Sequence, residues 1–278
     1  MRAYPAALRA LAVFLQVLAA LNVAYIGENV ILDLLEGTRR APALLVAQAL
    51  AAFSGGPWAL TALLRRLRRA KVELGATHLT LTLRGTQVEI PLASIKALRP
   101  FALPLPGAGL ALELASGRRF RQRLLLDAPG ALLAALAERL PAARGALGRP
   151  PVAFADAQHE RSRQPWYFWA LKWGVYPLVL TVIVFRLNQF IMYGGPLGQY
   201  QMYGLGPYLK SFLNYWASTA GGLALYAAIV RALAEPLAFA LTWLLPARAR
   251  LFRGGAEIVC QGAYFVLVPA FVALRFLL

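Results

Sequence analysis

FRLNQFIMYGGPLGQYQMYGLGPYLKSF (residues 185–212) separates two long apolar runs, and its placement decides how the whole chain is arranged. Between residues 193 and 208 it carries four tyrosines, several glycines and prolines, and no lysine or arginine. Tyrosine is enriched where a membrane meets water, because its ring is apolar and its hydroxyl is hydrated. Glycine and proline disfavour a continuous helix. We therefore predict that 193–208 is an interfacial or re-entrant loop between two membrane spans.

The apolar runs predict an integral membrane protein. The chain has 278 residues and is 59% hydrophobic, above the roughly 45–50% of soluble domains. Several runs approach or exceed the ~20 apolar residues that cross a bilayer. We predict five spans, at residues 7–24 (helical to 35), 42–64, 165–193, 208–245 and 258–278. An even number of spans, in which 236–245 re-enters the membrane, is the alternative.

Basic residues give the predicted orientation. The net charge is +17, an excess that in a soluble chain would suggest nucleic acid. Here the charge is concentrated in RRLRRAK (65–71) and PARARLFR (246–253), and such clusters flank spans on the cytoplasmic side. We predict a cytoplasmic N-terminus, an external C-terminus and no nucleic-acid partner. The abundance of Arg, Ala and Leu indicates a GC-rich bacterial genome, hence the bacterial inner membrane.

Residues 72–142 change to a period of two, which is typical of half-buried strands. THLTLTLR, TQVEIPL and SIKALRPF predict three strands, and LALELASGRRFRQRLLL predicts a hairpin that turns at Ser116-Gly117. A helix follows, with Asp127 as its predicted N-cap. Its predicted apolar face consists of Leu132, Leu133, Leu136 and Leu140. Residues 143–164 are predicted to be a polar linker.

A helical hairpin followed by EIPLASIKALRP, GLALELASGRRF and a closing helix resembles the bacterial membrane-anchored pleckstrin-homology-like (PH-like) proteins. The resemblance covers residues 1–142 and implies a binding or assembly module rather than a catalyst. The predicted fold is a multi-span α-helical membrane protein with an inserted small α+β PH-like cytoplasmic domain. Its parts are a transmembrane hairpin (1–71), the PH-like domain (72–142), the linker (143–164) and a three-helix transmembrane region (165–278).

Alternating arginines form the first candidate site. Arg119, Arg121 and Arg123 share one face of a predicted strand, where they could bind anionic lipid headgroups or a partner protein. The alternative is a solvated strand face without a ligand.

Polar residues near two predicted outer span ends form a second candidate site, a vestibule with a Glu28–Arg186 pair. Its members are Glu28, Arg186, Asn188 and Gln189. The alternative is side chains that extend to water from the membrane interface. Two further pairs with a spacing of four, Arg231/Glu235 and Arg253/Glu257, indicate either an intramembrane relay or separate surface ion pairs.

The residue types give no sign of catalytic chemistry. One cysteine, Cys260, permits no intramolecular disulfide, and His78 and His159 are far apart in sequence. We predict no catalytic residue, metal or cofactor. The preferred interpretation is a scaffold, assembly or regulatory subunit that binds membrane lipids and membrane-protein partners. The alternatives are a transport or lipid-handling component with an outer-leaflet polar vestibule, and an enzyme acting on a lipid-linked substrate.

Overall fold

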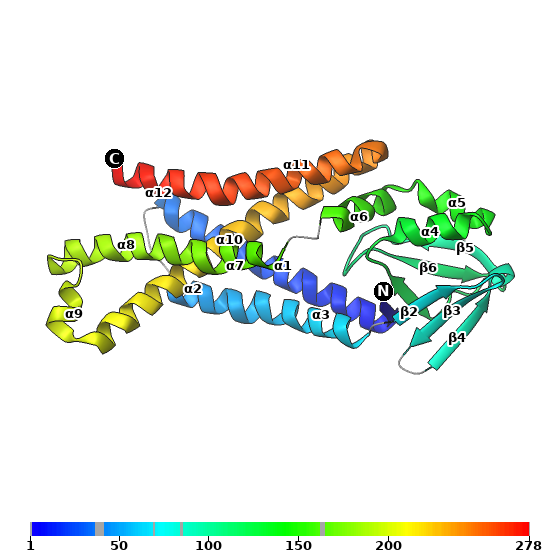
Figure 1. The fold of residues 1–278 in the computed structure, drawn as a ribbon, viewed down its shortest axis with the longest axis horizontal. Coiled ribbons are helices and arrows are strands. Elements are labelled where there is room, and N and C mark those ends of the chain that lie inside the picture. Colours follow the sequence, from blue (N-terminus) through cyan, green and yellow to red (C-terminus); the bar gives the residue numbers. More distant parts are fainter. Residues whose placement is uncertain (1, 37–41, 69, 84–85, 162–164, 278) are drawn as a thin grey trace. The chain divides into compact units, whose positions relative to one another are not determined.

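The computed structural model describes residues 2–36, 42–68, 70–83, 86–161 and 165–277, which form helices and two antiparallel sheets (Figure 1). In these residues five helices are long and apolar enough to cross a membrane, as predicted. They indicate a multi-pass membrane protein. These candidate spans are Ala6–Val30, Leu44–Leu67, Trp166–Tyr193, Leu205–Leu244 and Pro246–Ala270.

The chain divides into two compact units. The first comprises Met1–Ala19, Gly56–Arg163 and Arg231–Gln261, and the second comprises Ala20–Gly55, Gln164–Val230 and Gly262–Leu278. Long helices run from one unit into the other, so each unit is described by its own contacts.

The helices include three π-helical turns within otherwise α-helical segments. After α1 (Ala6–Glu36), α2 (Ala43–Leu50) continues through a π-turn, η1 (Ala51–Gly55), into α3 (Gly56–Leu67). Likewise α7 (Trp166–Ala170) continues through η3 (Leu171–Val175) into α8 (Tyr176–Tyr193), which a short α9 (Gly198–Tyr203) follows. The last helices are α10 (Leu205–Leu244), a 3₁₀ turn η4 (Pro246–Arg248), α11 (Ala249–Gly262), η5 (Ala263–Leu267) and α12 (Val268–Leu277).

The last two candidate spans differ from the prediction at one boundary. Helix α10 passes through Pro236 without interruption. By length and composition, the last candidate span begins at Pro246 rather than at residue 258. The 193–208 loop is interrupted as predicted, at Gly194 and Gly204, which both have positive φ.

In the part of the chain that the structure describes, seven strands form the two sheets. One has the order β1-β7-β6-β5 and the other β2-β3-β4. The five predicted strands are all present; the sequence reasoning missed β1 and β2. The strands are β1 (Arg2–Pro5), β2 (Ala70–Leu74), β3 (His78–Leu83), β4 (Thr86–Pro91), β5 (Ile95–Pro100), β6 (Gly109–Leu114) and β7 (Gln122–Leu125).

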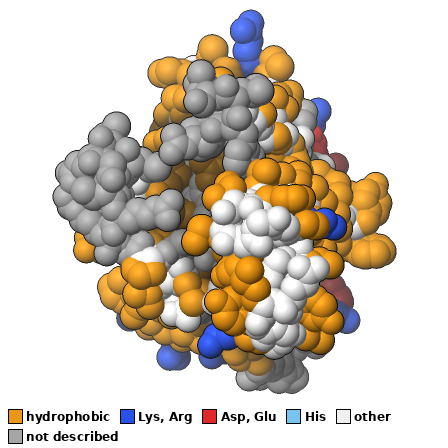
Figure 2. Space-filling view, turned by 90° about the vertical axis from the view of Figure 1, so that its left-hand side faces the viewer, with side chains coloured by type: hydrophobic (Ala, Val, Ile, Leu, Met, Phe, Trp, Pro, Cys, Tyr) orange, Lys and Arg blue, Asp and Glu red, His pale blue; other side chains and the backbone are white. Residues whose placement is uncertain are grey.

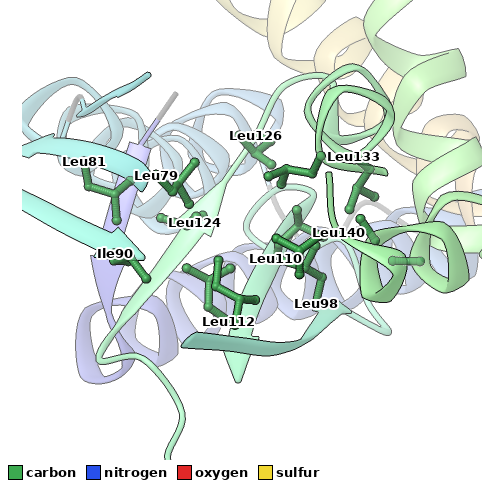
Figure 3. Packing of buried hydrophobic residues seen from close by; sticks show 14 of the residues in the cluster. Leu79, Leu81, Ile90, Leu98, Leu110, Leu112, Leu124, Leu126, Leu133 and Leu140 are labelled. Atoms are coloured by element: carbon green, nitrogen blue, oxygen red, sulfur yellow. The ribbon is translucent and has the colours of Figure 1, made fainter. Parts of the chain in front are cut away.

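Both sheets share one hydrophobic core with the helices α4 (Pro129–Ala137), α5 (Pro141–Leu147) and α6 (Pro150–Arg161). We call the seven strands and these helices the sheet module. Leu79, Leu81 and Ile90 point into the core from one sheet, and Leu110, Leu112 and Leu124 from the other (Figure 3). The predicted apolar face of α4 and the residue after it is confirmed, with Leu133, Leu136 and Leu140 buried and Leu132 packed against the core.

The range 143–164 contains α5 and α6 rather than the predicted polar linker; its residues 162–164 lie outside the described part of the chain. Pro141 and Pro150 each occupy the first position of a helix, where the missing N–H has no intrahelical partner to lose. Ala143, Ala146 and Val152 are buried in the module core. The prolines therefore start helices here.

Helix α4 is capped from α6 instead of by Asp127. Its N-cap is Ala128, which forms no side-chain cap, and the Gly130 N–H donates to Oδ1 of Asp156 at 3.0 Å. A Cβ atom at residue 130 would overlap the Asp156 carboxylate, so any larger residue there would have to displace that side chain. Burial raises the pKa of Asp156 above its usual value of 3.8, against the lowering effect of the Gly130 hydrogen bond.

We expect Asp156→Asn to be at least as stable as the parent protein at neutral pH. The pKa of Asp156 is higher in the folded chain than in the unfolded chain. Ionisation of Asp156 therefore lowers the stability as the pH rises from the unfolded pKa through the folded pKa. Asparagine keeps the acceptor for Gly130 and removes the charge. Thermal unfolding of the full chain in detergent should show the two proteins converging at about pH 3, below the unfolded pKa. Asp156→Ala, which loses the acceptor, should be destabilised by about 1 kcal/mol; an Asn variant less stable than the Ala variant would contradict this account.

Candidate functional site: an interhelical charge cluster and a basic sheet face

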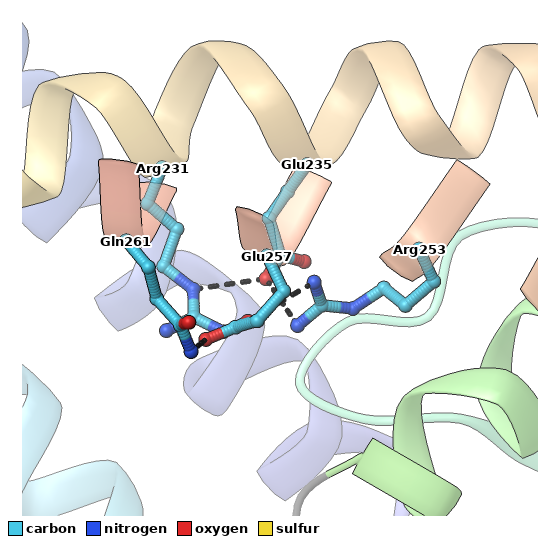
Figure 4. Close-up of polar contacts among 5 residues, drawn as sticks. All are labelled: Arg231, Glu235, Arg253, Glu257 and Gln261. Carbon is cyan, nitrogen blue, oxygen red and sulfur yellow. Dashed lines mark hydrogen bonds and ion pairs between the residues drawn. The ribbon is translucent and has the colours of Figure 1, made fainter. Parts of the chain in front are cut away.

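Four charged side chains from two helices form the charge cluster, which we define as Arg231, Glu235, Arg253 and Glu257. Arg231 and Glu235 lie one turn apart on α10, and Arg253 and Glu257 lie one turn apart on α11 (Figure 4). The side chains of the two helices point toward one another. The two pairs that the sequence indicated therefore form one cluster, rather than two separate surface ion pairs.

Each carboxylate in the charge cluster contacts both guanidinium groups. Oε1 of Glu235 lies 2.9 Å from Nε of Arg231 and 3.1 Å from Nη2 of Arg253. Oε2 of Glu257 lies 3.4 Å from Nη1 of Arg253 and 3.8 Å from Nη2 of Arg231. Gln261 donates to the second oxygen of Glu257 at 3.4 Å. Opposite charges thus alternate around the cluster, which has no net charge.

Burial makes this arrangement important for the helix pair. The Arg253 side chain is only 4% exposed, and a buried ion without its partner is strongly destabilising. Near the turn between α10 and α11, Ala238 and Ala256 are buried against Phe154 of α6. The Phe154 ring packs edge-on against Phe239, with 5.1 Å between the ring centres. Arg250 and Glu160 form an ion pair at 2.8 Å. The charge cluster holds α10 against α11. Helix α6 contacts both helices and so connects them to the sheet module.

The predicted basic strand face has two different environments. Arg119 and Arg121 are exposed, and Arg119 bridges through its backbone to Glu113, whose carboxylate pairs with Arg99 at 2.6 Å. Arg123 is half-buried and lies opposite Tyr4 of β1. Leu124 points into the module core, so Arg123 and Leu125 share the other face of the sheet. Only Arg123 lies within β7, which begins at Gln122, so the three arginines do not form the single strand face that was predicted.

That other face packs against the ends of two candidate spans. Leu125, Tyr4 and Phe101 form a small core with Leu8 of α1 and Leu64 of α3. Arg9 donates from Nη2 to the Leu105 carbonyl at 3.2 Å, and its guanidinium lies 3.7 Å from the centre of the Phe101 ring. Arg65 donates to the Pro106 carbonyl. Sequence reasoning missed Arg9 and Arg65 as partners of this face, because neither contact is local in sequence.

The predicted outer polar residues do not come together as a vestibule. Glu28 and Arg186 are both exposed, and no ion pair or hydrogen bond joins them in the described part of the chain. Asn188 is half-buried. Gln189 is fully buried and forms a closed network: its Nε2 donates to Gln199 Oε1 at 3.0 Å, and its Oε1 accepts from the Gln199 backbone N–H at 3.1 Å.

The amide network holds the 193–208 loop against its own helices. Gln199 also donates to Ser211 Oγ of α10 at 2.8 Å, so α8, α9 and α10 are tied by one set of polar contacts. Figure 2 views the side on which α9 lies in Figure 1, and hydrophobic side chains cover much of the part that is not grey, with backbone and uncharged polar side chains between them. Ile191, Met192, Met202 and Tyr203 are among the exposed apolar residues there. This is the composition of a membrane-interface surface.

Two π-turns also meet, at a tyrosine that sequence reasoning did not single out. Tyr264 in η5 is buried and donates to the Lys172 carbonyl of η3 at 2.8 Å. Tyr176 donates in return to the Tyr264 carbonyl at 3.1 Å. A π-turn leaves backbone carbonyls open to such bonds. No short sequence pattern signals these two hydrogen bonds, which join residues about 90 positions apart.

In the residues that the structure describes, no group of three or more His, Cys, Asp or Glu could hold a metal ion. Cys260 is a free thiol, half-buried on α11. Comparison of the chain with protein-family models, with curated proteins and with solved structures gave no match. The fold and the sites thus define a class only: a multi-pass helical protein whose sheet module is built onto the ends of its apolar helices.

Proposed function

We propose that this chain is a multi-pass protein of the bacterial inner membrane that acts as a scaffold, assembly or regulatory subunit. Its sheet module is the cytoplasmic PH-like part, which binds a partner protein or lipid headgroups. The observation that carries the proposal is the position of β1. Residues 2–5 pair with β7 and lead directly into α1, and α3 returns the chain to β2. The module is therefore continuous in sequence with the start of α1 and with the end of α3.

Such a construction favours binding at a membrane surface. The Ala3 N–H donates to the Arg68 carbonyl at 3.2 Å, which closes β1 against the chain entering β2. Seven strands, in sheets of four and three, equal the number in the barrel of the PH-like family and so support that assignment. The depression beside Phe101 and Pro104 has no enclosed space for even a water molecule and has no charged lining residue. Exposed surfaces are the better candidates for binding.

The same contacts support the proposed topology. Because β1 belongs to the sheet module, the N-terminal strand and the module lie on one side of the membrane. The α10–α11 turn contacts α6 of the module and lies on that side too. In the proposed five-span topology 193–208 lies on the opposite side, and its lack of lysine and arginine supports this.

Cysteine labelling tests this topology. In a Cys260→Ser background, an impermeant thiol reagent added to intact cells should label Gln201→Cys but not Ser116→Cys, and both should react after permeabilisation. Both positions are exposed, so access to solvent is matched. The reverse pattern would put the sheet module outside the cell and remove its access to cytoplasmic partners.

Site-specific photo-cross-linking tests the scaffold function. A photoreactive side chain at Gln87, exposed on the edge strand β4, should give a discrete, stoichiometric protein adduct in growing cells. The same group at exposed Leu213 of α10 is the control for random collisions in the membrane. A chain that gives no adduct, stays a monodisperse monomer and retains its cellular activity would rule the scaffold function out.

A further inference from the structure

The 101–108 loop between β5 and β6 combines an apolar surface with attachment to two candidate spans. Leu103 is 60% exposed and Leu105 is 37% exposed. The carbonyls of Leu105 and Pro106 accept hydrogen bonds from Arg9 of α1 and Arg65 of α3. Both arginines lie within one turn of the ends of their candidate spans, Ala6–Val30 and Leu44–Leu67. The loop is therefore attached to the ends of both candidate spans.

Positive charge without a carboxylate gathers beside this loop. Arg123 lies opposite Tyr4 of β1, and β1 leads directly into α1, which carries Arg9. Neither Arg9 nor Arg123 forms an ion pair with a carboxylate in the described residues. The Nε atom of Arg9 is buried and has no hydrogen-bond partner there. Guanidinium groups in this state favour an anion, above all a phosphate, which accepts several of their hydrogen bonds.

Arg119, which precedes β7, differs from Arg123 in its distance from the 101–108 loop and in having a carboxylate nearby. Strand β6 starts beside the 101–108 loop at Gly109, and the 115–118 turn lies at its far end, roughly 17–20 Å away for six residues. Arg119 lies at that far end opposite Glu113, whose carboxylate supplies a negative charge nearby. Arg123, in contrast, lies opposite β1 and two residues from Leu125, which packs with Leu8 of α1 and Leu64 of α3.

We propose that the 101–108 loop inserts Leu103 and Leu105 into the interface of the membrane, and that Arg9, Arg65 and Arg123 bind the phosphate of an anionic phospholipid beside it. The occupant is a lipid because the loop carries exposed apolar side chains and is fixed to the span ends. This deepens the proposed function and rests on it for the membrane location of the module. The site lies at the helix–sheet junction rather than along the whole Arg119–Arg123 face.

The test uses the full chain, purified in neutral detergent, with phosphatidylglycerol and phosphatidylcholine as probes measured by native mass spectrometry. Each basic residue near an anionic surface changes binding about fivefold. The Arg9→Gln/Arg123→Gln variant should therefore lose phosphatidylglycerol affinity by about tenfold or more. Arg119→Gln/Arg121→Gln removes the same number of charges from exposed positions just before β7 and should change it less than about twofold. Equal losses in both variants, or no preference for phosphatidylglycerol over phosphatidylcholine, would overturn the site.

Three further arms distinguish a lipid site from a folding defect, a soluble-anion site and a protein interface. Arg9→Lys/Arg123→Lys keeps the charge and should restore most of the binding, whereas a folding defect would not be rescued in this way. Displacement of phosphatidylglycerol by inorganic phosphate alone would assign the site to a soluble anion and overturn the lipid assignment. Protection of Arg123→Cys from labelling by a partner protein, with no effect of lipid, would make this face a protein interface and would also overturn it.

Loop insertion has its own readout. In the Cys260→Ser background, a fluorophore on Leu103→Cys in nanodiscs should be quenched by lipids that carry a quencher near the headgroup, and a fluorophore on Ser116→Cys should not. Equal quenching at both positions would refute insertion. The phosphatidylglycerol and quenching measurements use no partner protein, so they can succeed even if the Gln87 cross-link fails. Failure of the phospholipid site and failure of the scaffold function can therefore be told apart.

Discussion

Glu235→Gln is expected to lower the free energy of unfolding by about 3 kcal/mol, because it removes one carboxylate from a buried arginine. Oε1 of Glu235 serves both Arg231 and Arg253, and Arg253 is the most buried member of the charge cluster. Glutamine has the same shape but no charge, so the loss reports electrostatics rather than packing. Equilibrium unfolding of the full chain in mixed micelles, with hydrogen exchange of α10 and α11, measures the change.

A double-mutant cycle separates the pair from its surroundings. Arg253→Met alone should also be costly, whereas Glu235→Gln with Arg253→Met removes both charges and should cost at least ~1 kcal/mol less than the two single changes together. The exposed pair Arg250–Glu160 is the matched control, because the Arg250 side chain is 80% exposed. Arg250→Gln should change stability by less than about 1 kcal/mol. Strict additivity of the two cluster variants would show that the side chains are not coupled.

The sequence contained more information about the charge cluster than its two separate spacings of four. Glu235 and Arg253 are each four residues nearer to the turn at Leu245 and Pro246 than Arg231 and Glu257 are. In an antiparallel helix pair such positions face each other. The opposite order of charges on the two helices then brings unlike charges together. Spacing within each segment was visible from the sequence, but the pairing depended on the uninterrupted course of α10 through Pro236.

The apolar spans were predictable because a run of apolar residues is a local property. The module strands with regular alternation were predictable for the same reason, and the turn at Ser116-Gly117 was confirmed. Strand β1 was not, since Arg2–Pro5 is four residues long and its partner lies more than a hundred residues further along the chain. The contacts of Arg9 and Arg65 with the 101–108 loop are non-local as well. The sequence therefore did not indicate that Arg123, of the three arginines, belongs to the sheet face that contacts α1 and α3.

The 143–164 range shows a different kind of error. A polar composition and a proline pair suggested a linker, although proline at the first position of a helix is a common start signal. The alanines and Val152 of this range supply small apolar contacts to the module core. Small residues have a weak hydropathy signal, so their burial depends on the neighbouring leucines of α4. Composition alone underestimates helices of this kind.

Gly109→Ala is the second change with a large expected effect, a loss of about 3 kcal/mol or more in the stability of the sheet module. Gly109 pairs with Leu125 at the start of β6. A Cβ atom there would overlap the Leu124 carbonyl oxygen and lie 2.6 Å from Cε2 of Phe101. The carbonyl belongs to the backbone of β7, so relief requires the two strands to separate. Phe101 also lies beneath Arg9, so the same displacement would disturb the loop that we assign to the membrane interface.

Hydrogen exchange of the full chain should show this loss as faster exchange in β6 and β7, by about a hundredfold for 3 kcal/mol, with the α10–α11 amides unchanged. Gly145→Ala is the control, because nothing lies within 4 Å of the added Cβ and the residue is inside α5. Alanine favours a helix by up to about 1 kcal/mol over glycine, so this variant should be as stable as the parent or more so. If Gly109→Ala exchanged no faster than Gly145→Ala, then β6 and β7 would not approach as closely as their register requires, and the position of Arg123 beside Arg9 would lose its structural basis.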